Sequence, residues 1–256
     1  MQYLKLGRSQ IILATFLVCS LLLAAYPAID LNISRLFFHG GSFPRDQWWQ
    51  SLLHDSLNWF IVLSLGVPAA LYAFNRLLGK QVASMCGRKL LYLFLVLALG
   101  AGLIVNVGLK DNFGRARPRD VAEFGGTKLF TPAFVISHEC RTNCSFSSGD
   151  AAGGFFSIAL VFALARRRRV AMVAGIAVGV IESLARISSG AHFFSDTVVS
   201  FFVMLIVADV LYFYMVMSPA ERANPALVPA LEPAFVATVT EPGAVTGAEP
   251  RDSHSL

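Results

Sequence analysis

Six apolar segments constrain this chain more than any other feature of its sequence. They are the following: Ile11 to Ala28, Leu57 to Leu78, Leu90 to Leu109, Gly149 to Ala165, Val170 to Ile187 and Phe193 to Met217. Each approaches the length of about 20 apolar residues that a helix needs to cross the hydrocarbon core of a bilayer. Because lipid offers the backbone no hydrogen-bonding partner, such a segment must form its hydrogen bonds internally, as a helix. We therefore expect an all-α, polytopic membrane protein with six transmembrane helices in one bundle.

The composition favours a membrane protein over a soluble one. Of the 256 residues, 55% are hydrophobic and only 14% are charged. The net charge of +5 would also suit a nucleic-acid-binding protein, but basic residues at the cytoplasmic ends of helices explain it without nucleic acid. The first apolar segment also resembles a signal peptide. No small-residue cleavage site follows it, so we expect an uncleaved first helix.

Basic residues predict the orientation of the helices. An N-inside arrangement of six helices leaves these on the cytoplasmic side: Lys5, Arg8, Arg76, Lys80, Arg88, Lys89 and Arg166 to Arg169. The same arrangement puts the loop after Lys110 on the outer face of the membrane. That loop is itself basic, as a loop that binds phosphate would be. The chain then divides into residues 1–89 with two transmembrane helices, a core at 90–217, and a disordered cytoplasmic tail at 218–256, which is rich in Pro, Ala and Glu.

An amphipathic stretch on the outer side separates the first two apolar segments. Its aromatic residues alternate with polar ones and include Phe37, Phe38, Trp48 and Trp49. Such residues are typical of the membrane–water interface. We expect either an aromatic belt or a surface through which lipid enters. His39 and His54 have no metal-ligand spacing, so we expect both on the surface.

Three polar clusters stand at the edges of the apolar segments. They span Lys110 to Pro118, Ser147 to Asp150, and Arg186 to Asp196. The predicted topology gathers them on the outer face, because the fourth segment begins there, the fifth ends there and the sixth begins there.

The clusters contain the residue types that hold a phosphate. Arg117 and Arg186 offer bidentate guanidinium donors, and Lys110 offers a point charge. Ser148 and Gly149 begin a helix, where free backbone N–H groups favour an anion. We expect these five residues to bind the phosphate group of a substrate.

The third cluster also contains a candidate nucleophile. His192 can attack phosphorus and form a phospho-histidine, which water later hydrolyses. Asp196 follows one helical turn later, where it can hold the other imidazole nitrogen and stabilise the imidazolium. This chemistry requires no metal and no cofactor.

Taken together, the clusters resemble the motifs of the type 2 phosphatidic acid phosphatase superfamily. Those motifs are Lys-x6-Arg-Pro, Pro-Ser-Gly-His and Ser-Arg-x5-His-x3-Asp. They are matched by Lys110, Arg117 and Pro118, by Ser148 and Gly149, and by Arg186, His192 and Asp196. The resemblance covers Leu90 to Met217 and implies a helical-bundle core, a phosphomonoesterase or pyrophosphatase activity, and the phospho-histidine mechanism. The run from Cys140 to Asp150 is most similar to the branch that includes bacterial lipid A 4′-phosphatases. This resemblance implies a multi-pass protein of a bacterial inner membrane, with the outer face and its active site in the periplasm.

Three positions depart from the superfamily pattern. Ser147 replaces a proline, Ala185 replaces a serine, and Asp150 replaces the histidine that protonates the leaving group. Aspartate is ordinarily an ionised base at neutral pH. Asp150 would therefore act as the catalytic acid only if burial kept it protonated, and the surrounding cations oppose that.

The substrate and the activity leave several alternatives open. A lipid A 4′-phosphate is favoured by the resemblance, whereas a pyrophosphate such as undecaprenyl pyrophosphate needs less help from an acid. Phosphatidic acid and phosphatidylglycerol phosphate are further candidates. A catalytically inactive lipid-phosphate-binding protein and a transporter are the alternatives from other classes. Vanadate-dependent haloperoxidases share the phosphate pocket of the superfamily, but the apolar membrane segments of this chain argue against a haloperoxidase. The sequence leaves the oligomeric state open.

Cys140 and Cys144 lie in the loop that is expected outside, where oxidation persists. We therefore expect a disulfide between them, with two free thiols as the alternative. The small loop that it closes would shape the approach to Ser148.

Overall fold

The computed structural model describes residues 7–44, 47–79, 82, 85–165, 168–219 and 222. These residues are almost entirely helical, and among them only two isolated β-bridges occur. The helices in chain order are α1 (Arg8–Ala25), α2 (Ala28–Arg35), α3 (Trp48–Leu78), α4 (Gly87–Leu95), η2 (Val96–Lys110), η3 (Pro118–Asp120), η4 (Ala122–Phe124), α5 (Gly149–Phe155), α6 (Ser157–Leu164), α7 (Arg168–Ser188), α8 (Phe194–Leu211) and η5 (Tyr212–Val216). The prediction of an all-α membrane protein is confirmed.

Five of the helical segments are long and apolar enough to cross a membrane: Arg8–Ala25, Trp48–Leu78, Gly87–Lys110, Arg169–Ser188 and Phe194–Val216. They match five of the six predicted segments. The remaining predicted segment, the fourth in chain order, is a shorter apolar helical stretch, Gly149–Leu164, which is divided at Phe156 into α5 and α6. Six membrane crossings therefore remain a prediction.

The short α5–α6 segment forms the centre of the bundle. Its side chains are buried from Ala151 to Ala159, and α5 packs against α7, α8 and the π-helix η2. A helix that is apolar on every side is stable where other helices surround it. Around it lies the main hydrophobic core, to which Tyr92, Phe156 and Met204 contribute.

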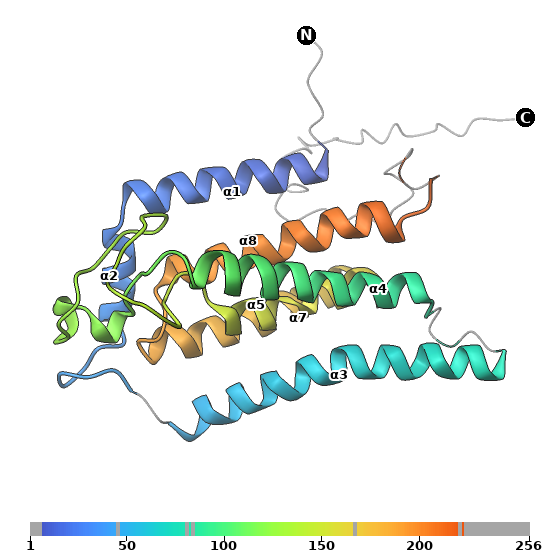
Figure 1. The fold of residues 1–256 in the computed structure, drawn as a ribbon, viewed down its shortest axis with the longest axis horizontal. Helices are drawn as coiled ribbons and strands as arrows, with labels where there is room; N and C mark the ends of the chain where they lie inside the picture. The colour runs from blue at the N-terminus through green and yellow to red at the C-terminus, as the bar shows by residue number, and fades with distance from the viewer. Residues whose placement is uncertain are drawn as a thin grey trace, which may run out of the picture.

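The long helices lie side by side, and the irregular loop at 111–148 gathers at one end of them with α2 (Figure 1). α1 and α3 reach the same end, and both α5 and α8 begin there (Figure 1). The N-terminus of α1 lies at the opposite end, where Arg8 forms an ion pair with the buried Asp209 of α8. The three polar clusters are therefore gathered at one end of the bundle, as the topology predicts.

Aromatic rings pack beneath the loop at this end. Phe43 is buried, and its ring centroid lies 5.2 Å from the centroids of both Phe38 and Phe124. Phe37 is partly buried against the same cluster, whereas Trp48 is 76% exposed. The exposure of Trp48 agrees with the predicted aromatic belt at the membrane–water interface. Phe37 and Phe38 instead help to hold the loop on α2.

The predicted boundary between residues 1–89 and the core at 90–217 does not separate two packing units. α1 contacts α8, and α3 contacts α4, α5 and α7. The predicted disordered tail lies outside the described residues, apart from positions 218, 219 and 222.

Candidate active site

The buried imidazole of His192 is the centre of the candidate site. His192 lies in the turn between α7 and α8, and it is 2% exposed. Its Nδ1 atom lies 2.7 Å from the backbone carbonyl oxygen of Ser145. Because a carbonyl oxygen only accepts hydrogen bonds, Nδ1 carries the proton and Nε2 keeps its lone pair when the ring is neutral. The local backbone therefore leaves Nε2 as the nucleophilic nitrogen.

Asp196 supplies negative charge next to this ring, as its spacing predicts. It does so without a direct hydrogen bond to the second imidazole nitrogen. Its nearest carboxylate oxygen lies 3.6 Å from His192 Nδ1, which is too long for a hydrogen bond. The same oxygen accepts hydrogen bonds from Ser145 Oγ at 2.5 Å and from the backbone N–H of Phe193 at 2.8 Å. Asp196 thus fixes Ser145, and the Ser145 carbonyl orients the histidine.

Burial lowers the pKa of His192 below its usual range. Asp196 acts in the opposite direction, whereas Arg117 and Lys110 lower the pKa further. The imidazole is therefore neutral at neutral pH, which is the form that can attack phosphorus.

Arg115 is a residue of the site that its sequence pattern does not predict. It is 1% exposed and forms ion pairs with Asp196 at 2.6 Å and with Asp30 of α2 at 2.8 Å. It also donates to Thr131 O and Ser195 Oγ, both at 2.8 Å. The guanidinium is buried and already held by these four partners, so it stabilises the site rather than binding a phosphate. Asp30 stands in an apolar run of the sequence, and a buried carboxylate requires a positively charged or hydrogen-bonding partner. The position of Asp30 could therefore have indicated a buried cation such as Arg115.

Gly114 allows Arg115 to reach this position. Its φ is +59°, and a Cβ atom there would lie 1.9 Å from the carbonyl oxygen of Ser137. Backbone hydrogen bonds from Cys140 to Gly114 and from Ser145 to Arg115, both 2.9 Å long, then tie the two arms of the loop together. The loop therefore aligns Arg115 and Ser145 with the start of α8.

Arg117 is held by the short loop that a disulfide closes. Cys140 and Cys144 are bonded, with their Cα atoms 5.6 Å apart. Between them, Asn143 accepts hydrogen bonds from Arg117 at its backbone oxygen, at 2.8 and 3.2 Å, and at its side-chain oxygen, at 2.9 Å. The disulfide loop thus directs this guanidinium.

Lys110, Arg117 and Arg186 lie within electrostatic range of one another. Lys110 ends η2, and Arg186 stands in the last turn of α7. Burial and the neighbouring charges of Arg119 and Arg186 lower the pKa of Arg117. Cations that crowd together in this way favour the binding of an anion.

Arg186 is engaged by two side chains, one of them unexpected. Its Nε lies 2.6 Å from the Asp150 carboxylate, and one terminal nitrogen lies 2.6 Å from Nδ1 of His54. His54 Nδ1 is also 3.7 Å from Asp150. His54 is exposed, as predicted, but it also contacts two residues of the site, which its sequence context does not predict. α3 extends back to Trp48, well before the apolar segment starts, and it carries His54 into the site.

Ser148 and Gly149 have structural partners. Ser148 is buried, and its Oγ accepts from the N–H of Ala151 at 3.3 Å, which caps α5. A Cβ atom on Gly149 would lie 2.7 Å from Asn106 Oδ1, so glycine permits the close contact with η2. Their predicted role in phosphate binding stays a prediction.

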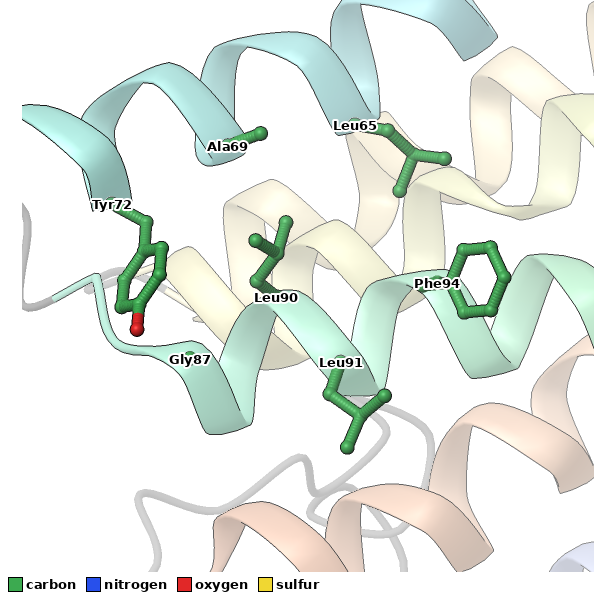
Figure 2. Close-up of a pocket in the computed structure, with 7 residues that line it drawn as sticks. All are labelled: Leu65, Ala69, Tyr72, Gly87, Leu90, Leu91 and Phe94. Carbon is green, nitrogen blue, oxygen red and sulfur yellow. The ribbon is translucent and has the colours of Figure 1, made fainter.

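An apolar pocket of about 440 Å³ leads away from the cations between α3 and η2. Lys110 and Asp150 line it together with apolar residues that include Leu57, Ile61 and Leu97. A second pocket of about 440 Å³ shares Leu65 and Phe94 with the first and continues to Tyr72. In Figure 2, Leu65 and Tyr72 of α3 and Leu90 of α4 point into the space between the two helices. The two pockets together form an apolar groove along α3, with a charged end.

Comparisons with known proteins agree with this geometry. The PAP2 superfamily profile matches residues 90–219. The chain is 33% identical over 178 residues to a lipid A 4′-phosphatase of Francisella tularensis subsp. novicida, covering 68% of this chain and 80% of that protein. It is 31% identical over 204 residues to lipid A 4′-phosphatases of Rhizobium leguminosarum and Rhizobium etli, covering 72% of this chain and 85% and 77% of theirs. No solved structure matches the chain significantly.

Proposed function

The chain belongs to the PAP2 superfamily and is a membrane-embedded phosphoric monoester hydrolase that acts on lipid, and we propose that it removes the 4′-phosphate of lipid A. The observation that carries the mechanism is the Ser145 carbonyl on Nδ1 of His192, which leaves Nε2 free for attack. The relatives named lipid A 4′-phosphatase, which the chain covers over most of their length, support the choice of substrate.

The proposed reaction proceeds in two displacements. Nε2 of His192 attacks phosphorus, the P–N bond forms, and the P–O bond to the sugar breaks as its oxygen takes up a proton. Water then attacks the phospho-histidine, so that phosphate leaves and the imidazole is restored. Lys110, Arg117 and Arg186 stabilise the negative charge on the phosphoryl oxygens in both steps.

Two further parts of the proposal concern the lipid and the membrane. The apolar groove along α3 would hold an acyl chain while the phosphate contacts Lys110 at the charged end. We place this end at the periplasmic face, because the Cys140–Cys144 disulfide lies there and disulfides persist in an oxidising compartment. Thiol labelling of intact cells with a membrane-impermeant reagent, before and after reduction, tests the orientation. Labelling that appears only after reduction supports both the orientation and the disulfide. Absence of labelling after reduction contradicts the orientation, and labelling without reduction rules out the disulfide.

A pyrophosphate substrate is the second candidate, and Asp150 is the observation that favours it. Asp150 forms an ion pair with Arg186 at 2.6 Å, where the superfamily motif has a histidine. A phosphate leaving group needs little protonation, whereas a sugar alkoxide needs a general acid.

The test is phosphate release by purified protein in detergent. The panel contains lipid A, undecaprenyl pyrophosphate, phosphatidic acid and phosphatidylglycerol phosphate. The proposal expects turnover of lipid A above the others, loss of turnover in His192→Ala, and an acid-labile phospho-enzyme in the wild type. Turnover of the pyrophosphate alone would select the second candidate. Binding of these lipids without turnover of any would identify an inactive binding protein instead.

A further inference from the structure

We infer that His54 of α3 gives the proton to the leaving oxygen and then takes a proton from the attacking water. This inference rests on the proposed phosphatase function and deepens it. It assigns a catalytic role to a residue outside the region that matches the PAP2 superfamily, which begins at residue 90. In this chain, the imidazole that the second motif lacks would come from another helix.

The geometry places His54 on the guanidinium that would hold the phosphate. Its Nδ1 is 2.6 Å from a terminal nitrogen of Arg186 and 3.7 Å from a carboxylate oxygen of Asp150. A phosphate bound to Arg186 by charge-assisted hydrogen bonds lies at about 2.7–2.9 Å from the same guanidinium. Its ester oxygen would therefore be within reach of the His54 ring. The His54 side chain is 47% exposed, so both substrate and water can approach it.

The chemistry explains why Asp150 is paired with a histidine. Asp150 is held in an ion pair with Arg186, an arrangement that favours a carboxylate rather than a proton donor. Histidine, in contrast, gains and loses its proton between about pH 5 and 8, so one ring can serve as acid and then as base. Asp150 is therefore a positioning residue, and His54 is the group that transfers the proton.

Substrate binding would bring His54 and Asp150 into the arrangement that is needed for proton transfer. In the structure, Arg186 donates a hydrogen bond to His54 Nδ1, so the neutral His54 ring carries its proton on Nε2. A phosphate dianion competes with Asp150 and His54 for Arg186. Once Arg186 turns its donors to the phosphate, Nδ1 can be protonated and face the Asp150 carboxylate.

The proton balance closes over one turnover. The His54 imidazolium gives its Nε2 proton to the leaving oxygen as the P–O bond breaks and the bond from phosphorus to His192 forms. Neutral His54 then accepts a proton from water as the water oxygen bonds to phosphorus and the P–N bond breaks. Both histidines return to their starting forms, and the products are the dephosphorylated lipid and phosphate.

The charged groups around the pair come from three elements. They are Asp150 of α5, Arg186 and Glu182 of α7, and Lys110 of η2. Of these groups, Arg186 and Asp150 lie nearest to His54, at 2.6 and 3.7 Å from its Nδ1 atom.

The experiment compares two leaving groups in wild type, His54→Gln and His54→Ala. The substrates are p-nitrophenyl phosphate, whose leaving group needs little protonation, and the best lipid phosphomonoester of the panel. Glutamine can still accept from Arg186 but cannot transfer a proton. For the lipid, we expect kcat to fall by about 10²–10⁴-fold with little change in KM. For p-nitrophenyl phosphate, we expect a burst of one equivalent of nitrophenol followed by slow turnover, because formation of the phospho-enzyme survives and its hydrolysis does not.

Controls separate this inference from folding and from the proposed function. Asp55→Asn, at the exposed next position of α3, should leave all rates unchanged. Asp150→Asn should lower kcat less than His54→Gln does, and it should shift the pH profile. Wild-type kcat on the lipid in a folded His54→Gln protein overturns the inference, as does an equal loss on both substrates without a burst. Failure of wild-type protein on every phosphate ester would instead overturn the proposed function.

Discussion

At the scale of single residues, the site depends on backbone groups as much as on side chains. His192, Asp196 and Arg186 were predictable, because their types and spacing carry the chemistry. The Ser145 carbonyl that orients His192 was not, since any residue at that position supplies a carbonyl oxygen. His54 was also missed, because it contacts Arg186 from a distant part of the chain.

The pKa of His192 leads to a prediction about pH. The parameter kcat/KM reports the free enzyme, and attack requires the neutral imidazole. Because burial lowers the His192 pKa, the neutral form persists as the pH falls below the usual value of about 6.5. We therefore expect the acidic limb of kcat/KM that belongs to His192 to lie below pH 6.5.

Steady-state assays from pH 4.5 to 8 check this expectation. The ionisation of the substrate phosphate, near pH 6 to 7, is measured separately and divided out. A remaining acidic limb, on which kcat/KM falls as the pH is lowered, with its midpoint above pH 7 would mean that His192 is not the titrating nucleophile.

At the scale of elements, a buried charge cluster holds the site together. Arg115 joins Asp30 of α2 to Asp196 of α8, while its own backbone belongs to the long loop. The helices themselves were predictable from apolar length, but this cluster was not. Arg115 stands two residues before the motif arginine, and only the fold shows that it points into the protein while Arg117 faces the site.

Arg115→Met should destabilise the protein strongly. The substitution keeps an apolar stem but leaves Asp30 and Asp196 without their cation, and breaking a buried ion pair costs about 3–5 kcal/mol. Thermal unfolding in detergent measures the loss. The control is Arg119→Met, since the Arg119 side chain is partly exposed and lies 3.9 Å from the carboxylate of Asp120. Equal stability of the two variants would contradict the role of Arg115.

The disulfide predicts an effect on substrate binding. Cys144→Ser frees the loop that positions Arg117 through Asn143, and Arg117 is expected to bind phosphate. We expect KM to rise by about tenfold, the loss of about 1.4 kcal/mol of binding, while the His192 chemistry persists. Reduction of the wild type should reproduce the effect, and Cys19→Ser is the matched control. An unchanged KM in Cys144→Ser would show that the loop does not orient Arg117.

At the scale of the whole molecule, the loop at 111–148 and the starts of α5 and α8, which carry the polar clusters, lie at one end of the helical bundle (Figure 1). The six apolar segments and their order predict this arrangement, because they bring the three polar clusters to the same face. They do not predict the groove between α3 and η2, which depends on how far α3 stands from its neighbours. Together the groove and the charged end suit a molecule with an anionic head and an apolar chain.

Filling the groove should therefore separate lipid from soluble substrates. Ala98 lines the groove, and Ala98→Trp would displace part of a bound acyl chain. Excluding two methylenes costs about 1.6 kcal/mol, which corresponds to an increase in KM of roughly tenfold for the lipid. Hydrolysis of p-nitrophenyl phosphate, which has no acyl chain, should keep its wild-type kcat/KM. The control is Leu99→Trp, because Leu99 is the next residue on η2 and does not line the groove. If both variants hydrolyse the lipid equally well, the acyl chain does not lie between α3 and η2; if Ala98→Trp impairs both substrates, the substitution has distorted the site itself.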